Sequence, residues 1–91
     1  MELVIVSPVR RLYSAEADEV SFPGTAGRFT VLTGHAPLIS SLEEGDIIYT
    51  VHGRQTSLRV KRGCVRVLND SIEACVETDA ATSAPDNKEK E

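Results

Sequence analysis

The most informative stretch of the sequence is residues 22–42, which read FPGTAGRFTVLTGHAPLISSL. Short apolar runs are separated there by three glycines and two prolines: Pro23, Gly24, Gly27, Gly34 and Pro37. Glycine tolerates backbone angles that other residues resist, and proline fixes one of them, so this spacing predicts consecutive tight turns between short strands. We therefore interpret the two prolines, together with Gly24 and Gly34, as structural turn residues.

The rest of the chain repeats this pattern of short apolar runs bounded by Gly, Pro, Asn or Asp. Val and Ile dominate the runs and no region keeps a helical period, which is typical of an all-β sandwich or barrel. We predict strands over residues 3–6, 12–15, 19–22, 28–32, 38–42, 47–52, 55–60, 63–68 and 71–77. The predicted fold class is an antiparallel β-sandwich.

Two hairpins can be written in register. A type II′ turn at Gly53-Arg54 predicts the pairs Val51–Thr56, Tyr49–Leu58 and Ile47–Val60. A turn at Asn69-Asp70 predicts the pairs Val67–Ile72, Val65–Ala74, Arg66–Glu73 and Cys64–Cys75. Both registers place apolar residues opposite one another on one face, as a half-buried antiparallel pair requires.

Length and composition indicate one small domain. The chain has 91 residues and a formal net charge of −4. We place the sandwich at residues 1–79 and expect residues 80–91 to form a disordered polar tail, because that segment has no apolar residue larger than Ala. The acidic balance argues against a nucleic-acid partner. No apolar run is long enough to span a membrane and the start lacks a signal peptide's basic residues, so we expect a cytosolic chain without direct membrane insertion.

Candidate catalytic and metal-binding groups are few. His35 and His52 are the only histidines, and a metal site needs several converging ligands. Ser40 or Cys64 could pair with His35 as nucleophile and base, but neither lies in a strand–elbow–helix signature. We interpret His35 as a turn residue that bonds nearby backbone groups. We expect no catalytic residue, no metal and no cofactor, and two reduced thiols.

Two further patterns have structural interpretations that we favour. The glycines could cradle a phosphate, but no Lys-Ser/Thr pair follows them and no helix begins there. Basic side chains gather in the third quarter of the chain, at Arg54, Arg59, Lys61, Arg62 and Arg66. A solvated sheet face is the favoured interpretation of this cluster, and a docking surface for an acidic partner is the alternative.

The segment of residues 22–42 resembles the motif LPGxxGxxGVLPGHAPL of the epsilon subunit of F-type ATP synthases, whose mitochondrial counterpart is the delta subunit. The matching positions are Pro23-Gly24, Gly27, Val31-Leu32 and Gly34-His35-Ala36-Pro37-Leu38. Thr30 and Thr33 stand where glycine and proline are usual. The resemblance extends to an opening strand that ends in Val6-Ser7. It extends more weakly to the family's SGGxxxV region at residues 61–67, where Arg62 replaces a glycine.

This resemblance implies a β-sandwich of about ten strands that acts as a non-catalytic central-stalk (rotor) subunit of a proton-translocating ATP synthase. Its partners would be the gamma subunit and the membrane c-ring, with transient or no contact with the alpha/beta headpiece. The chain would help to couple proton flow to ATP synthesis from the cytoplasmic face of the cell membrane. A stand-alone β-sandwich binding module is the alternative, and a small thiol or metal enzyme built on Cys64, Cys75 and His35 is a weaker one.

The resemblance also assigns site residues. Ser7, His35 and Ser40 match family positions that face gamma. The turn Thr25-Ala26-Gly27-Arg28 matches the loop that meets the c-ring, although an acidic residue is common where this chain has Arg28. Full-length relatives usually continue into a C-terminal helical hairpin that can restrain ATP hydrolysis. Residues 78–91 have neither the length nor the apolar stripes for one, so we expect that this brake is missing.

Overall fold

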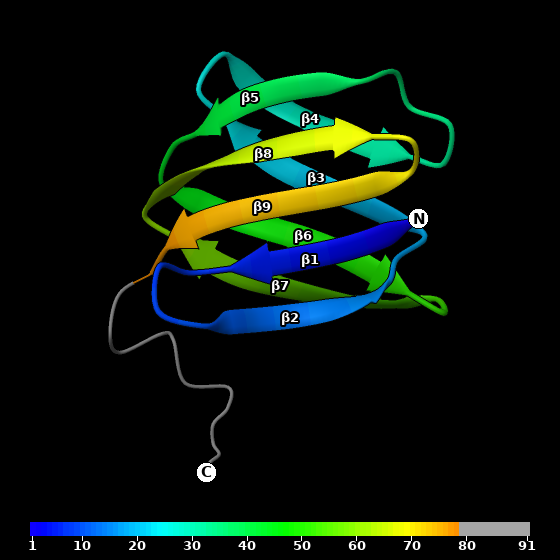
Figure 1. Ribbon diagram of the computed structural model, residues 1–91, viewed down its shortest axis with the longest axis horizontal. Coiled ribbons are helices and arrows are strands. Elements are labelled where there is room, and N and C mark those ends of the chain that lie inside the picture. Colours follow the sequence, from blue (N-terminus) through cyan, green and yellow to red (C-terminus); the bar gives the residue numbers. More distant parts are fainter. Residues whose placement is uncertain (79–91) are drawn as a thin grey trace, which may run out of the picture.

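In the computed structural model, which describes residues 1–78, the chain folds into two packed β-sheets (Figure 1). The nine strands of this part are β1 (Glu2–Val6), β2 (Arg11–Glu16), β3 (Glu19–Gly24), β4 (Gly27–Leu32), β5 (Leu38–Leu42), β6 (Gly45–Val51), β7 (Arg54–Val60), β8 (Arg62–Leu68) and β9 (Ser71–Glu77). All nine overlap the predicted ranges, and the predicted all-β sandwich is confirmed. Residues 1–78 contain no helix that could cross a membrane. The tail predicted at residues 80–91, and any C-terminal helical hairpin, lie outside the described residues.

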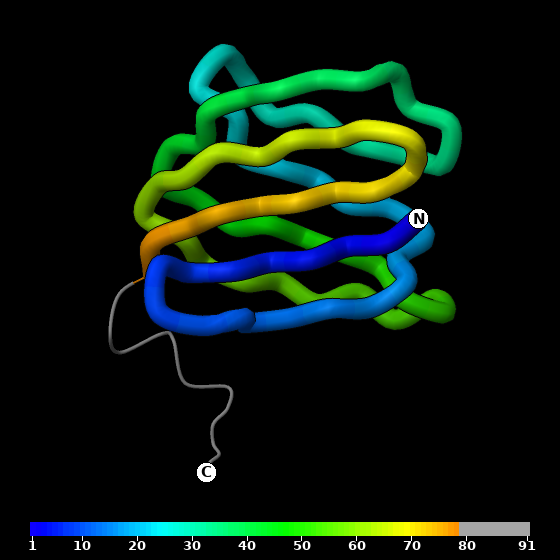
Figure 2. The backbone as a smooth tube through the Cα atoms, viewed as in Figure 1, coloured from blue at the N-terminus to red at the C-terminus, as the bar shows by residue number. Residues whose placement is uncertain are grey.

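The strands are arranged in two layers. The front sheet has the order β2-β1-β9-β8-β5, and the back sheet has the order β4-β3-β6-β7. A single bridge between Gly24 of β3 and Leu42 of β5 joins the layers at one corner. The sequence predicted antiparallel pairing throughout, but β1 and β9 run parallel, from Glu2 beside Ser71 to Val6 beside Cys75. This pairing places the first and the last described strands side by side at the centre of the front sheet (Figure 2).

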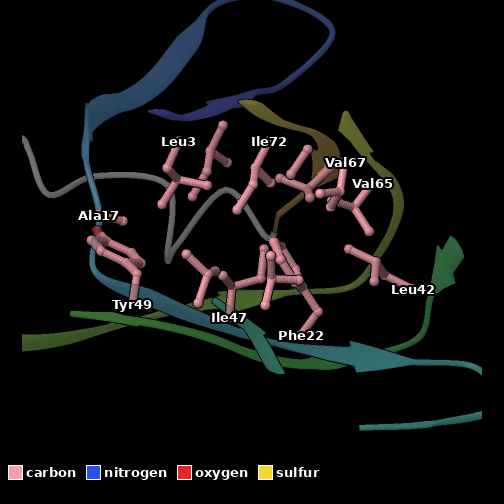
Figure 3. Close-up of a cluster of buried hydrophobic side chains, with 14 of the residues drawn as sticks. Leu3, Ala17, Phe22, Leu42, Ile47, Tyr49, Val65, Val67 and Ile72 are labelled. Atoms are coloured by element: carbon pink, nitrogen blue, oxygen red, sulfur yellow. The ribbon is translucent and has the colours of Figure 1, made fainter. Parts of the chain in front are cut away.

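The core lies between the layers. Leu3, Ile72, Val67 and Val65 of the front sheet point toward Tyr49, Ile47 and Phe22 of the back sheet (Figure 3). Each of these side chains is at most 7% exposed. The alternation of the strands explains this arrangement, because every second side chain of a strand points to the same face.

The β8–β9 hairpin has the predicted register, including Cys64 opposite Cys75 and Arg66 opposite Glu73. Asn69 and Asp70 both adopt positive φ, 52° and 61°, as a type I′ turn requires.

The predicted register of the β6–β7 hairpin is wrong by two residues. The turn is His52-Gly53, with φ of 52° and 78°, rather than Gly53-Arg54, so it is type I′ instead of II′. The observed pairs are Val51–Arg54, Tyr49–Thr56 and Ile47–Leu58. A shift of two residues keeps every side chain on its predicted face, since the period of a strand is two. The sequence-based prediction placed Gly53 at the first position of the turn. In the structure His52 occupies the first position, with a positive φ, and Gly53 occupies the second.

Gly63 of β8 has no room for a side chain. A Cβ atom there would overlap the carbonyl oxygen of Cys75 and would lie 2.9 Å from the Cα atom of Val76. Both obstacles are backbone atoms of the neighbouring strand β9, so they cannot move aside alone. The preceding Arg62, which replaces the glycine usual in the resembled family, points away and pairs with Glu77 at 3.0 Å. The chain therefore needs the second glycine of that motif but not the first.

We expect Gly63→Ala to lower the free energy of unfolding by about 1–3 kcal/mol, because the added methyl group forces β8 and β9 apart. Chemical denaturation followed by circular dichroism measures this change. Ser57→Ala, at an exposed position of β7, is the control and should change stability by less than about 0.5 kcal/mol. Equal stability of the two variants would contradict the packing described for Gly63.

Among the described residues, Tyr49 is the one ionisable core side chain whose pKa is clearly shifted. It is 7% exposed, and its ring centroid lies 4.5 Å from that of Tyr13. Burial, and secondarily the charge of Tyr13, raise the pKa of the Tyr49 phenol above its ordinary value of 10.0. In the unfolded chain the phenol loses its proton at the ordinary pKa, whereas in the folded domain it keeps the proton to a higher pH. Deprotonation therefore lowers the free energy of unfolding only when the pH exceeds the ordinary pKa.

We therefore expect the contribution of Tyr49 to stability to be constant below pH 10.0 and to fall as the pH rises toward the raised pKa. Denaturation curves across this alkaline range check it. The Tyr49→Phe variant should lose less stability than the parent over the same range, while Tyr13→Phe should still show the Tyr49 loss. If the free energy of unfolding changed with pH in the same way for the parent and for Tyr49→Phe, the raised pKa of Tyr49 would be refuted.

Candidate functional site

Ser7 organises the turn between β1 and β2. Its hydroxyl donates to the Arg10 carbonyl oxygen at 3.2 Å and accepts from the backbone N–H groups of Val9 and Arg10 at 3.4 and 3.3 Å. A serine that satisfies turn groups in this way is a local structural element. The half-buried Ser7 side chain therefore fixes the shape of the turn, and the neighbouring Pro8 and Val9 are exposed.

His35 lies in the β4–β5 loop and is half-buried. Its Nδ1 atom lies 2.7 Å from the Ala36 carbonyl oxygen, and its backbone N–H donates to the Leu32 carbonyl at 3.0 Å. The preceding Gly34, at φ 85°, donates its N–H to the Asp70 carboxylate at 2.7 Å. The His35 loop is thus tied to the β8–β9 turn, and His35 makes the nearby backbone contact that the sequence predicted.

Ser40 lies on β5 opposite Val65. Its side chain alternates with the exposed Ile39 and Ser41, so it points to the inner side of the sheet, where it is half-buried. Its hydroxyl donates to the Ser41 carbonyl at 3.0 Å. Ile39 and Ser41, rather than Ser40, are presented on the outer face of the front sheet.

The structure does not gather Ser7, His35 and Ser40 into one cluster. Ser7 follows Val6, which pairs with Cys75 near the end of β9, whereas the His35 loop contacts Asp70 just before β9 begins. A strand of seven residues separates these ends by about 20 Å. Figure 2 shows the β1–β2 turn and the β4–β5 loop at opposite ends of the front sheet.

The turn between β3 and β4 carries the predicted ring-facing residues. Thr25 and Ala26 form its tip and are exposed, and Gly27 adopts φ 127°. Thr25 is anchored to Ser41 of β5 through a 2.9 Å contact between their hydroxyl oxygens.

Arg28 does not extend from the tip of this turn. Its guanidinium donates to the Ser21 hydroxyl at 2.7 Å and to the Asp46 carbonyl at 2.5 Å. The positive charge is therefore held against the back sheet, beside β3 and β6.

The basic cluster predicted in the third quarter is divided between the two sheets. Among residues 1–78, its ion pairs include Arg59 with Glu44 at 3.4 Å and with Asp46 at 3.6 Å, Arg62 with Glu77 at 3.0 Å, and Arg66 with Glu73 at 2.5 Å. All of these side chains are substantially exposed, so each pair contributes about 1 kcal/mol at most. The arrangement supports the solvated-face interpretation over a docking surface for an acidic partner.

The contacts of the candidate catalytic groups His35, Ser40 and Cys64 are with other residues rather than with one another. His35 and Ser40 each contact a neighbouring backbone carbonyl, and Cys64 is paired with Cys75 five positions from the β8–β9 turn that the His35 loop contacts. Within residues 1–78, no group of three or more His, Cys, Asp or Glu side chains could hold a metal ion.

Sequence reasoning missed an apolar surface on the outer face of the front sheet. A groove of about 410 Å³ lies there, and its outward-pointing lining includes Val4, Val6, Ile39, Cys64 and Cys75. A second hollow of about 400 Å³ adjoins it at Ile39 and includes Pro37 and Leu68. Ile39 is 80% exposed and Leu68 is 47% exposed. We call these two hollows together the front groove. Its residues come from four strands and the β4–β5 loop, so no local pattern could have revealed it.

The contact between Asp70 and Gly34 can be tested at one amide. We expect Asp70→Ala to speed hydrogen exchange at the Gly34 amide about tenfold, because losing the charge-assisted bond costs about 1.5 kcal/mol. Asp70→Asn should speed exchange less than Asp70→Ala, since asparagine retains an acceptor oxygen and tolerates positive φ but lacks the negative charge. NMR measures the exchange of individual amides. The His52 amide, which donates to Asp18 at 3.0 Å, is the internal control and should not change. An unchanged Gly34 rate in Asp70→Ala would contradict the contact.

Comparisons with known proteins agree with this fold. The β-sandwich superposes on a chain of the mitochondrial ATP synthase of Euglena gracilis with a TM-score of 0.77, covering 81% of this chain and 48% of that one at 14% identity. A chain from the central stalk and c-ring of the Tetrahymena thermophila mitochondrial enzyme gives a TM-score of 0.72 at 14% identity, covering 85% and 63%. At this identity the two likenesses show the fold alone.

Sequence comparisons show the family. The chain is 36% identical to the ATP synthase epsilon chain of Geotalea uraniireducens and 38% identical to that of Trichlorobacter lovleyi, each over 78 residues. These alignments cover 86% of this chain and 56% of each relative, so the chain spans little more than half of their length. Residues 1–82 match the family described as "ATP synthase, Delta/Epsilon chain, beta-sandwich domain". The resemblance found in the sequence is therefore confirmed, and the chain belongs to the family of ATP synthase delta/epsilon chains through their β-sandwich domain.

Proposed function

We propose that this chain is a non-catalytic central-stalk subunit of a proton-translocating ATP synthase, which docks the gamma subunit onto the membrane c-ring. The match of residues 1–82 to the β-sandwich domain of delta/epsilon chains is the observation that carries this proposal. The chain would couple proton flow to ATP synthesis by fixing the rotor stalk to the ring. It would act at the cytoplasmic face of the membrane, peripherally, with transient or no contact with the alpha/beta headpiece.

The front groove is the part of the surface best suited to the gamma subunit. Small soluble domains rarely leave large contiguous apolar patches exposed unless a partner covers them. Here Val4, Val6 and Ile39 combine with the two cysteines, and the ion pair Arg66–Glu73 crosses the patch. An apolar centre with a polar rim is the usual composition of a specific interface.

Of the three residues assigned by resemblance, Ser7 and His35 lie in segments that flank the front face. The β1–β2 turn, which Ser7 shapes, and the β4–β5 loop, which carries His35, flank opposite ends of the front sheet. Ser40 points to the inner side of β5, and its neighbour Ile39 points outward. A gamma subunit that covers the front groove would meet both ends at once. A partner of standard size buries about 800 Å² on each side, which is enough to span the sheet.

We assign the c-ring contact to the turn of residues 25–28. Its tip is exposed at the corner where the two sheets meet, and the bond between Thr25 and Ser41 fixes its position relative to β5. The contact would use the backbone and the small side chains of the tip, because the Arg28 guanidinium is already bonded to Ser21 and Asp46.

Capture of partners by the tagged chain tests both the function and the face. From detergent-solubilised native membranes, the parent chain should retain gamma together with other ATP synthase subunits, as identified by mass spectrometry. Ile39→Arg should weaken binding of purified gamma at least about tenfold, equivalent to about 1.4 kcal/mol, because it places a charge in the apolar centre of the interface. Ser57→Arg, on an exposed position of the back sheet, should bind like the parent.

The outcomes separate the two parts of the proposal. If the parent chain captures no ATP synthase subunit, the chain is not a rotor subunit, and a stand-alone binding module becomes the better account. If gamma binds but Ile39→Arg binds equally well, the function holds and the front groove is the wrong face. Circular dichroism of both arginine variants confirms that any loss of binding is not a loss of folding.

A further inference from the structure

We propose that Cys64 and Cys75 form a redox-active dithiol, which small disulfides such as glutathione disulfide convert into a reversible cross-strand disulfide. The two residues are directly opposite each other on β8 and β9, and both are exposed free thiols. This inference goes beyond the proposed function and does not depend on it.

The register brings the two thiols within bonding reach. Pairs in an antiparallel ladder alternate outward from the tight turn at Asn69-Asp70, so Cys64 and Cys75 occupy a hydrogen-bonded pair with Cα atoms about 5.5 Å apart. Disulfides accept Cα separations of about 4.4–6.8 Å, so no strand has to change register.

The same geometry makes the bridge reversible. Cβ atoms of directly opposed residues lie about 4.5–5.5 Å apart, whereas a disulfide prefers about 3.8 Å. Closing the bridge therefore draws β8 and β9 together locally and strains them. Strained and exposed disulfides are the readily reduced ones, in contrast to the buried bridges that hold secreted domains together. We expect a bond that forms and breaks with the redox state of its surroundings.

The charges around the pair set the order of attack. Arg62 and Arg66 flank Cys64 along β8, while Glu73 and Glu77 flank Cys75 along β9. Glutathione disulfide is anionic, so the guanidinium groups of Arg62 and Arg66 attract it toward Cys64, and the carboxylates of Glu73 and Glu77 repel it from Cys75. Cys64 is therefore the attacking thiol and Cys75 the resolving thiol.

The reaction balances in two exchange steps. The Cys64 thiolate attacks one sulfur of glutathione disulfide, whose S–S bond breaks and releases one glutathione thiolate. The Cys75 thiolate then attacks the Cys64 sulfur and displaces the second glutathione. The protein loses two electrons and two protons, and one glutathione disulfide becomes two molecules of glutathione.

Intact-mass spectrometry of the purified full chain tests this proposal, after equilibration with mixtures of reduced and oxidised glutathione and alkylation of the remaining thiols. The parent should become lighter by two hydrogen atoms, take up no alkyl group and return to the dithiol when the mixture is made reducing. Cys64→Ser and Cys75→Ser should stop at a glutathione adduct, which should form faster in Cys75→Ser, where Cys64 is the remaining thiol. The double variant should not react.

Two results would overturn the proposal. The first is a parent chain that stops at one or two glutathione adducts or at intermolecular dimers, under conditions that modify both single variants. The second is faster modification of Cys64→Ser than of Cys75→Ser, which would contradict Cys64 as the attacking thiol. Circular dichroism of the exposed-site variants establishes that all of them are folded. Because the experiment contains no gamma subunit, its failure would leave the proposed function untouched.

Discussion

The parallel pairing of β1 with β9 is the constraint on which the rest of the structure depends. It runs through five consecutive positions, from Glu2 beside Ser71 to Val6 beside Cys75. It inserts Leu3 and Ile5 into the core, where both are fully buried. In the described part of the chain β2 pairs only with β1, so the front sheet loses both strands without this contact. The same pairing places Val4 and Val6 beside Glu73 and Cys75 and thereby completes the front groove.

Features set by neighbouring residues could be predicted from the sequence. The strands follow from short Val-rich and Ile-rich runs between turn residues, and the β8–β9 register follows from the turn at Asn69-Asp70. The β6–β7 register could not be predicted as reliably, because either His52-Gly53 or Gly53-Arg54 can form a two-residue turn around the same glycine. The predicted face of each side chain was still correct, because the register is shifted by an even number of residues.

Features set by distant residues could not be predicted. The apolar–polar alternation within β1 and β9 does not specify that these two strands, which are far apart in the sequence, pair in parallel. Bringing them together closes a long loop, and the entropic cost of that closure cannot be read from the local sequence. The candidate site divides in the same way. The turn roles of Ser7 and His35 follow from local chemistry, whereas the front groove needs β1, β5, β8 and β9 to lie side by side. The resemblance supplied residues in the segments that flank this face, but not the apolar surface between them.

In the proposed function, the front face of the sandwich is where this chain would meet the gamma subunit. The native thiols Cys64 and Cys75 lie on that face and report on its exposure. The most direct measurement is their alkylation rate under reducing conditions, with and without saturating gamma subunit. A single cysteine at position 57 in a chain lacking the two native thiols serves as the reporter for the back sheet. We expect gamma to slow alkylation of the native thiols strongly and to leave alkylation of the Ser57→Cys reporter unchanged. Equal alkylation of the native thiols with gamma bound, or protection of position 57 alone, would contradict this expectation.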